Sequence, residues 1–394
     1  CNGGCAALWP PMMATATADS YSAASGATVY AGRSSGIPAW LAGVPLNKLI
    51  EIPNTRLAGS AGAPGEDYTD PFCASNRSIR AYSGVAFRHD LSELWLAAVG
   101  GHADSSDNSV RSIRLDADAP AWQMRHVQSA EEDKVMNAPY YLDGLPSSRH
   151  VYWSAHWCEP RNRIMLHGSR YCWGATTFVD SNGFNPDTNA WDAAGTWSDA
   201  AATAMCAERV SGNVWAASQQ GHLYKWTAST DTWALTATFD SSFPCYPPMA
   251  YDSLRDQLFT LAVGDGEATG SAVSCYRITA NGTTRTNITI ASSAAYTAWQ
   301  AAAGAYASME YDPINDRFIW YAAMNSGDSF YVITPNSGTT WDMSTISLAS
   351  GSVTPTAIGN SGLMSKLRYT PNLKGFMLMT NSTGNLYFLP TAQL

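Results

Sequence analysis

The sequence has few charged residues and almost no lysine, and this shortage excludes several classes of protein. Charged residues make up 14% of the 394 residues, and five of the 23 basic residues are lysines. Acidic residues number 32, which gives a net charge of −9. Proteins that bind nucleic acid usually carry a basic stripe that matches the phosphates, and the sequence has none. We therefore expect no nucleic-acid partner.

Long apolar runs are also missing. No stretch approaches the roughly 18 apolar residues that a membrane-spanning helix needs, so we expect no membrane span. The composition is nevertheless 45% apolar and 11% aromatic, with 31 glycines and 20 prolines. A disordered chain would have far fewer apolar and aromatic residues. The composition therefore predicts a folded protein.

Cysteine pairs with CxxC spacing are absent, although eight cysteines are spread between Cys1 and Cys275. Scattered cysteines in even number are typical of exported proteins with disulfides. The chain begins at Cys1 without an initiator methionine, which indicates a processed N-terminus. Two alternatives stay open here, because a signal peptide could have been removed or Cys1 could carry a lipid. We expect a secreted or extracellular protein, with lipid anchoring through Cys1 as the alternative.

A hairpin pattern recurs six times along the chain. Each copy is an apolar strand, a turn of Asp, Pro, Asn, Arg or Gly character, and a second strand. The copies begin at Ala81, Val151, Ala204, Met249, Ser308 and Leu367. A third strand and a Trp-containing fourth strand follow several of them. Six four-stranded units at a period of roughly 40–65 residues predict an all-β protein, a β-propeller of six blades, with seven blades as an alternative.

The last repeat lacks its Trp-containing strand, and this gap predicts how the ring closes. Residues 47–53 have strand character and stand alone before the first repeat. Because an open edge strand promotes aggregation, the ring must close. We predict that residues 47–53 form the outer strand of the last blade. Residues 1–45 are then an extended N-terminal segment, and residues 46–394 a single propeller domain.

The second hairpin brings several polar residues to one end of the channel. Its turn lies at residues 159–162, so His150 falls opposite Tyr171 and Tyr152 falls opposite residues 169–170. A loop of the preceding blade ends at the same face of the propeller. The register therefore predicts a cluster of five side chains, which are His102, His150, Tyr152, Arg170 and Tyr171.

Two segments carry a resemblance to a known family. They are VGGHADSSDNSV (99–110) and LDGLPSSRHVYWSAHWCEPRNRIMLHG (142–168). They resemble the kelch-like propellers of bacterial exported proteins, and together they look like the propeller-type polysaccharide lyases, such as the ulvan lyases. The resemblance covers roughly residues 46–390. It implies an exported lyase that cleaves a uronic-acid-containing polysaccharide by β-elimination.

The resemblance also implies roles for the clustered residues. Arg170 would neutralise the uronate carboxylate, and Tyr152 and His102 would act as the base and acid pair. His150 would be a second base or an orienting group. Substrate binding is assigned to four further residues, which are Asn108, Tyr171, Trp153 and Trp173. Each assignment has a structural alternative, since Asn108 could form a turn, Arg170 could pair with a carboxylate, and tryptophans often pack between blades.

No cofactor or metal is expected. His156, Cys158, His167 and Cys172 have the residue types of a zinc site, but the hairpin register rules out one shared ion. Cys158 lies beside the turn and Cys172 past the other end of the hairpin, on the order of 20 Å away at about 3.3 Å per residue. The signature that flanks the copper ligands of galactose oxidases is also absent.

Two cysteines of neighbouring blades could also form a disulfide. Cys158 and Cys206 are predicted near the turn-side ends of neighbouring innermost strands, where a disulfide between blades would be feasible. A non-catalytic extracellular propeller, which binds glycans or assembles with other chains at a cell surface, is the alternative to the lyase, and both have a polysaccharide as the expected partner.

Overall fold

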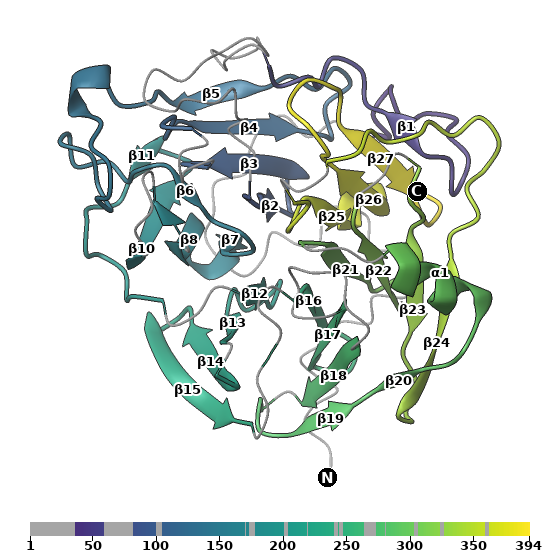
Figure 1. Ribbon diagram of the computed structural model, residues 1–394. Coiled ribbons are helices and arrows are strands. Elements are labelled where there is room, and N and C mark those ends of the chain that lie inside the picture. The colour runs from purple at the N-terminus through teal and green to yellow at the C-terminus, as the bar shows by residue number, and fades with distance from the viewer. Residues whose placement is uncertain are drawn as a thin grey trace, which may run out of the picture.

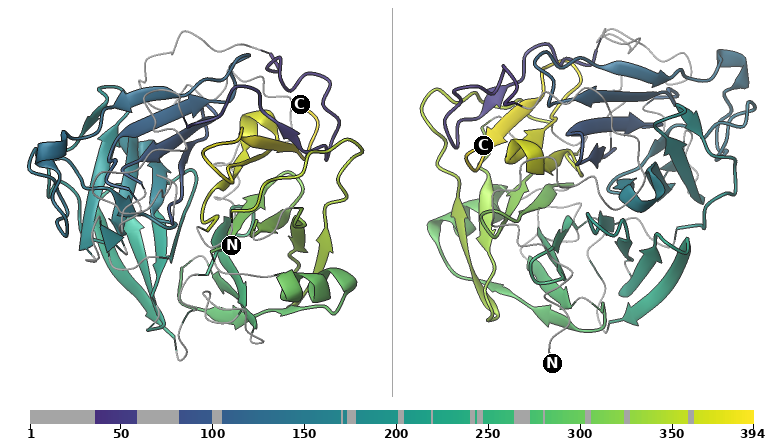
Figure 2. Two further views of the ribbon diagram at one scale, coloured as in Figure 1. Left: turned by 45° about the horizontal axis from the view of Figure 1, so that its top comes forward. Right: turned by 180° about the vertical axis from the view of Figure 1, so that it is seen from behind.

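Six sheets of four or five strands form a ring around a central axis, so the protein is a six-blade β-propeller (Figure 1). The computed structural model describes residues 36–58, 82–99, 105–169, 171–172, 178–200, 204–218, 220–239, 243, 247–263, 273–279, 281–302, 306–323, 327–358 and 362–394. The predicted all-β class and the count of six blades are confirmed. The two further views show the sheets around the same axis (Figure 2).

The blades follow one another along the chain, and in blades 1–5 the innermost strand comes first. Blade 1 comprises β2 (Ala86–Arg88), β3 (Glu93–Ala97), β4 (Val110–Arg114) and β5 (Gln123–His126). Blade 2 comprises β7 (Ala155–Cys158), β8 (Arg163–Ser169), β10 (Phe178–Asn185) and β11 (Ala190–Trp191), with the short pair β6 (Arg149–His150) and β9 (Tyr171–Cys172) at one end. Blade 3 comprises β12 (Ala204–Ala207), β13 (Val214–Ala217), β14 (His222–Thr227) and β15 (Thr232–Thr238).

The second half of the ring repeats this order. Blade 4 comprises β16 (Met249–Asp252), β17 (Gln257–Val263), β18 (Val273–Thr279) and β19 (Arg285–Asn287). Blade 5 comprises β21 (Ser308–Asp312), β22 (Arg317–Tyr321), β23 (Tyr331–Thr334) and β24 (Thr340–Thr345), and β20 (Thr289–Ile290) pairs with β24 in parallel. Blade 6 comprises β25 (Leu367–Thr370), β26 (Gly375–Leu378), β27 (Tyr387–Pro390) and β1 (Ile50–Glu51).

Helices are short and peripheral in the described part of the chain. The α-helix α1 (Ala294–Ala302) contacts the outer strand β24 and buries Trp299, whose ring meets Trp320 edge-on at 5.7 Å. Single 3₁₀ turns occupy Glu131–Asp133, Glu159–Arg161 and Pro371–Leu373. No helix among the described residues is long and apolar enough to cross a membrane.

The predicted closing strand is confirmed. Residues 50 and 51 form β1, which pairs antiparallel with β27 through Ile50 opposite Phe388 and Glu51 opposite Tyr387. The contact extends beyond β1, because the Asn47 N–H donates to the Pro390 carbonyl at 2.9 Å. The strand β1 thus fills the outer position of the last blade, where it lies beside β27 (Figure 1).

The hairpin of blade 2 has the predicted register. Ala155 pairs with Leu166 and Cys158 with Arg163 across the turn at residues 159–162. The turn ends at Asn162, whose φ of 51° is left-handed, a conformation that asparagine tolerates better than most residues. The predicted pair of His150 and Tyr171 also forms, between β6 and β9. Tyr152 instead bridges Ser83 of the segment before blade 1, and its predicted partner Arg170 lies outside the described residues.

The predicted disulfide between Cys158 and Cys206 is wrong, because both residues are buried free thiols. Cys158 belongs to the core between blades 2 and 3, where it packs with Met205 and Trp226. Cys206 follows Met205 in β12 and therefore points to the opposite face, into the core between blades 3 and 4. The two sulfur atoms lie on different sides of one blade.

Free cysteines allow a direct test of this correction. Burial raises the pKa of the Cys158 thiol to about 11 and that of the Cys206 thiol well above its usual range. We expect iodoacetamide to spare Cys158, Cys206 and Cys275 in the native protein and to label all three after unfolding without a reductant. Peptide mapping measures the labelling. If the unfolded protein were labelled at Cys158 and Cys206 only after reduction, the two residues would form a disulfide after all.

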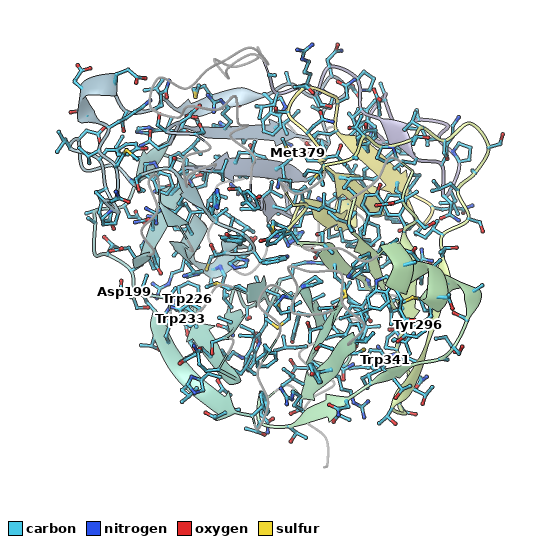
Figure 3. The ribbon with its side chains drawn as sticks, in the orientation of Figure 1. Asp199, Trp226, Trp233, Tyr296, Trp341 and Met379 are labelled. Atoms are coloured by element: carbon cyan, nitrogen blue, oxygen red, sulfur yellow. The ribbon has the colours of Figure 1, made fainter. Side chains whose placement is uncertain are left out.

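Two histidines of blade 2 lie in the interface with blade 3. The His156 and His167 rings are 5.9 Å apart, and the His167 ring lies 4.6 Å from that of Trp226. Trp226 and Trp233 mark this interface in Figure 3. Burial lowers the pKa of His167 to about 3, and burial and the charges of His167 and Arg368 lower the pKa of His156 well below its usual range.

These histidines predict a loss of stability in mild acid. The unfolded chain binds a proton at each imidazole below about pH 6.5, whereas folded His167 stays neutral down to about pH 3. Stability is therefore lost as the pH falls through this window, by about 1.4 kcal/mol per pH unit for one histidine. We expect His167→Leu to reduce the slope of unfolding free energy against pH between 4.5 and 6 by about this amount. Denaturant titrations measure it, and equal slopes would contradict the prediction.

Candidate functional site

Three tyrosines converge at one mouth of the channel. Tyr82, Tyr152 and Tyr306 precede the innermost strands of blades 1, 2 and 5. Their ring centroids lie 5.5 Å apart for Tyr82 and Tyr306, 6.2 Å for Tyr152 and Tyr306, and 6.4 Å for Tyr82 and Tyr152. We call these three residues the tyrosine cluster.

The backbone of the tyrosine cluster is strained. Its members have φ values of 50°, 46° and 64° for Tyr82, Tyr152 and Tyr306, in the left-handed region that bulky side chains avoid. Residues held there cost of order 1–3 kcal/mol each and often mark functional sites. All three residues lie where the chain enters an inner strand.

A histidine lies directly against the cluster. The His150 ring centroid is 4.7 Å from that of Tyr82, and His150 Nδ1 is 3.5 Å from the Tyr152 hydroxyl. His150 and Tyr152 are 1% and 3% exposed. The Tyr152 N–H donates to the Tyr82 carbonyl, which joins blade 2 to blade 1 beside the site. The arrangement places a phenol and an imidazole within reach of one proton.

The other predicted site residues have different positions. His102, Arg170 and Trp173 lie outside the described residues, and Tyr171 is described through its backbone in β9. Asn108 is 1% exposed. Its side-chain N–H groups donate to the Ser129 hydroxyl and the Pro146 carbonyl, and its side-chain oxygen accepts from the Ser129 N–H. These bonds tie the segment of Asn108 to two other loops.

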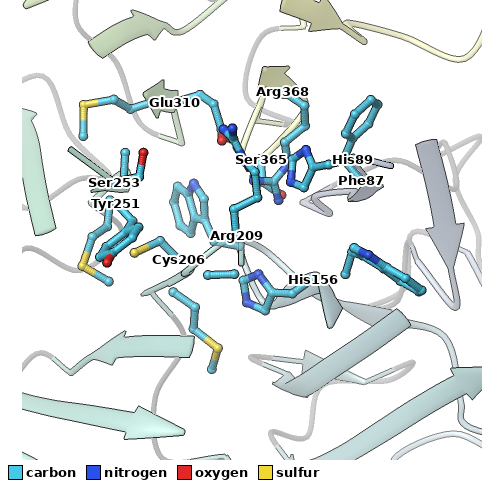
Figure 4. Close-up of a pocket in the computed structure, with 17 residues that line it drawn as sticks. Phe87, His89, His156, Cys206, Arg209, Tyr251, Ser253, Glu310, Ser365 and Arg368 are labelled. Atoms are coloured by element: carbon cyan, nitrogen blue, oxygen red, sulfur yellow. Dashed lines mark hydrogen bonds and ion pairs between the residues drawn. The ribbon is translucent and has the colours of Figure 1, made fainter. Parts of the chain in front are cut away.

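Trp153 contacts the tyrosine cluster and also lines a pocket inside the channel. It stacks on Tyr152 with ring centroids 6.4 Å apart and lines the pocket together with Ser365. The cavity has a volume of about 50 Å³. Its polar lining comes from several blades, through His89, His156, Arg209, Glu310 and Arg368 among others (Figure 4).

One ion pair crosses this channel pocket. Arg368 of β25 donates to Glu310 of β21 at 3.1 Å, and its other terminal nitrogen donates to the Val85 carbonyl at 2.9 Å. Burial and the positive charges of Arg209 and Arg368 hold the pKa of His89 well below its usual range. The histidines of the pocket are therefore neutral at pH 7, while its arginines stay charged.

Sequence reasoning missed the channel pocket and two members of the tyrosine cluster. Tyr82 and Tyr306 occupy the same position of the repeat as Tyr152, directly before an inner strand, and this recurrence was a usable signal. The pocket residues come from inner strands of different blades, and nothing in the local pattern marks them as neighbours. No group of three or more His, Cys, Asp or Glu side chains among the described residues is arranged to hold a metal ion.

Comparisons with known proteins do not identify the chain. No family model matches the sequence, and no curated protein matches it. A solved structure described as "Structure of YjhT" is 12% identical, with 64% of this chain and 74% of that chain covered and a TM-score of 0.39. Another, "Crystal Structure of Mitotic Checkpoint Complex", is 10% identical, with 94% and 97% covered and a TM-score of 0.42. At these values neither similarity bears on function, and the propeller assignment rests on the strand topology.

Proposed function

We propose that this propeller is a kelch-like polysaccharide lyase that cleaves a uronic-acid-containing polymer by β-elimination at the channel mouth. The observation that carries the proposal is the Tyr152 hydroxyl 3.5 Å from His150 Nδ1, surrounded by the aromatic rings of the tyrosine cluster. The resemblance of segments 99–110 and 142–168 to propeller-type lyases supports it. Because the propellers that these segments resemble are exported, we also propose an extracellular location.

β-Elimination needs a base for the proton at C5 of the uronate and an acid for the leaving oxygen at C4. The Tyr152 phenol loses its proton to His150 Nδ1, and the phenolate then takes the C5 proton. The electron pair of the C5–H bond forms the C4=C5 double bond and the bond to the C4 oxygen breaks. That oxygen leaves with a proton returned from Tyr152 or supplied by His102.

The reaction also requires neutralisation of the uronate carboxylate, because its charge opposes carbanion character at C5. Arg170 is the candidate that the family resemblance supplies, and it lies outside the described residues. Tyr82 and Tyr306 present aromatic faces and hydroxyls at the same mouth and are both partly exposed. We assign them to contact with the sugar rings.

Binding without cleavage is the second candidate function, and one observation favours it. His150 and Tyr152, the two residues proposed to transfer protons, have side chains that are almost fully buried beside Tyr82. Contact with a polymer then falls to the partly exposed Tyr82 and Tyr306. Such a protein would bind glycans through aromatic stacking and leave them intact.

A spectroscopic screen tests the proposal. The protein is incubated with polygalacturonate, alginate, hyaluronan and ulvan, and the ultraviolet absorbance of an unsaturated uronate product is followed. Dextran, which contains no uronic acid, is the control polymer. We expect absorbance to rise with at least one uronate polymer. Binding of such a polymer in sedimentation assays without any rise would overturn the lyase and leave the binding candidate.

A further inference from the structure

The outer edges of the blades differ in how they are protected. An edge strand presents unpaired N–H and C=O groups, and proteins guard such edges with short strands, charged side chains or a covering segment. The outermost strands β11, β19 and β1 have two or three residues each. The strand β5 has four residues and carries Arg125 and His126, and β24 is paired with β20 and contacted by α1. In the described part of the chain, five of the six blade edges are therefore short, charged or covered.

Blade 3 is the exception. Its outermost strand β15 is seven residues long, TWALTAT, with no charged residue and no proline. It pairs with β14 on one side, and no backbone hydrogen bond joins its other side to any described segment. Figures 1 and 2 show β15 at the rim of the ring, with no described strand outside it. A strand of this length presents a free edge of roughly 24 Å.

The side chains of β15 favour pairing with another strand. Threonine and tryptophan are enriched in strands, and β15 holds three threonines and one tryptophan. Leu235 lies at its centre and is 53% exposed. A bulge at Thr236 interrupts the ladder with β14, which increases the local twist but adds no charge to the edge. A long, exposed and uncharged edge strand is a site at which another strand can pair.

The neutrality of this edge favours a second copy of the chain as its partner. Residues 232–238 offer no charge that could select a charged foreign segment. Asp231 precedes the strand, but its carboxylate already accepts from Ser198 and Trp226. Two copies with a net charge of −9 each repel over much of their surfaces. A two-fold axis at the central Leu235 brings together the edge where that repulsion has no local source, because it places uncharged side chains opposite one another.

We propose that the free edge of β15 pairs antiparallel with β15 of a second copy, with Leu235 at the two-fold axis. The two four-stranded sheets join into one sheet of eight strands, which is within the usual size of a sheet. Both copies use the same surface, so the contact closes at a dimer and leaves neither β15 edge open to a third copy. The interface lies on the outer strand of blade 3, and the proposal does not depend on lyase activity.

Sedimentation at several concentrations tests the proposal. Sedimentation velocity of the full chain is measured from about 1 to 100 μM, the range in which a weak specific interface dissociates. We expect the mean sedimentation coefficient to rise with concentration to a plateau at the dimer. A parent protein that stayed monomeric throughout, or that formed larger species without this plateau, would overturn the proposal.

Matched variants locate the contact. Leu235→Lys places two ammonium groups opposite one another at the two-fold axis, and we expect it to weaken the dimer at least tenfold. Leu254→Lys is the control, because Leu254 is 55% exposed in the turn between β16 and β17 and undergoes the same chemical change. We expect this control to dimerise as the parent does. An equal loss in both variants, or no loss in either, would contradict the site.

A pair of opposite charges tests the two-fold axis itself. Leu235→Glu alone is expected to stay monomeric, as Leu235→Lys does, and both should keep the parent melting temperature because Leu235 is exposed. An equimolar mixture of the two variants places a carboxylate opposite an ammonium group, and we expect the mixture to form the dimer again. A mixture as monomeric as either variant alone would overturn the pairing of Leu235 with its copy.

Discussion

A variant without residues 1–55 is expected to aggregate instead of folding as a monomer. The deletion removes β1 and exposes the edge of β27, whose four residues are all buried in the intact protein. It also removes Leu49 and Ile52, which are fully buried, at about 1.5–3 kcal/mol for each side chain. An apolar edge strand without a partner is a template for pairing with another chain.

Size-exclusion chromatography and circular dichroism measure this outcome, and two point variants refine it. Ile52→Asp places a charge in the core beside blade 1 and is expected to cost about 3 kcal/mol or more in stability. Glu51→Ala is the matched control, because Glu51 precedes Ile52 and is exposed. We expect its effect to stay within about 0.5 kcal/mol. A deletion variant that stayed monomeric with an unchanged melting temperature would show that β1 does not close the ring.

Tyr152→Phe is expected to lower kcat on a cleavable uronate polymer by about 100-fold or more. The change removes the hydroxyl beside His150 Nδ1 and keeps the ring that packs against Trp153 and Tyr306. Proton transfer by a positioned side chain typically contributes 10²–10⁴-fold to a rate. Steady-state rates from the ultraviolet assay give the effect, and KM should change much less than kcat.

A second tyrosine separates chemistry from stability. Tyr321 of β22 is fully buried and stacks on Phe330 at 4.2 Å, far along the chain from the mouth residues of blade 2. Tyr321→Phe removes a buried hydroxyl in the same way and should keep the parent kcat. Arg170→Ala tests the neutralising role that the resemblance implies, with a loss expected to exceed the roughly 0.5–1.5 kcal/mol of a neutral hydrogen bond. If the Tyr152→Phe variant cleaved at the parent rate, Tyr152 would not be the base that takes the C5 proton.

The repeat pattern was sufficient to predict the blades. Each hairpin alternates apolar and polar residues around a turn, and these are local properties of the chain. The position of the turn at residues 159–162 therefore determines the pairing of Ala155 with Leu166 and of His150 with Tyr171. The closing strand was predictable for a different reason, since a ring of sheets leaves one outer position unfilled and residues 47–53 were the unassigned strand.

The sequence did not show which face of a strand each residue occupies, nor which residues of distant blades come into contact. Both depend on the tertiary structure. Cys158 and Cys206 both lie in inner strands, but a shift of one residue along β12 separates Met205 from Cys206 and sends the thiol to another interface. The tyrosine cluster and the channel pocket join residues from blades that are far apart in sequence, such as Tyr82 with Tyr306 and His156 with Arg368. Local alternation determines the blades of this protein, whereas the chemistry at the axis depends on how closure of the ring brings their inner edges together.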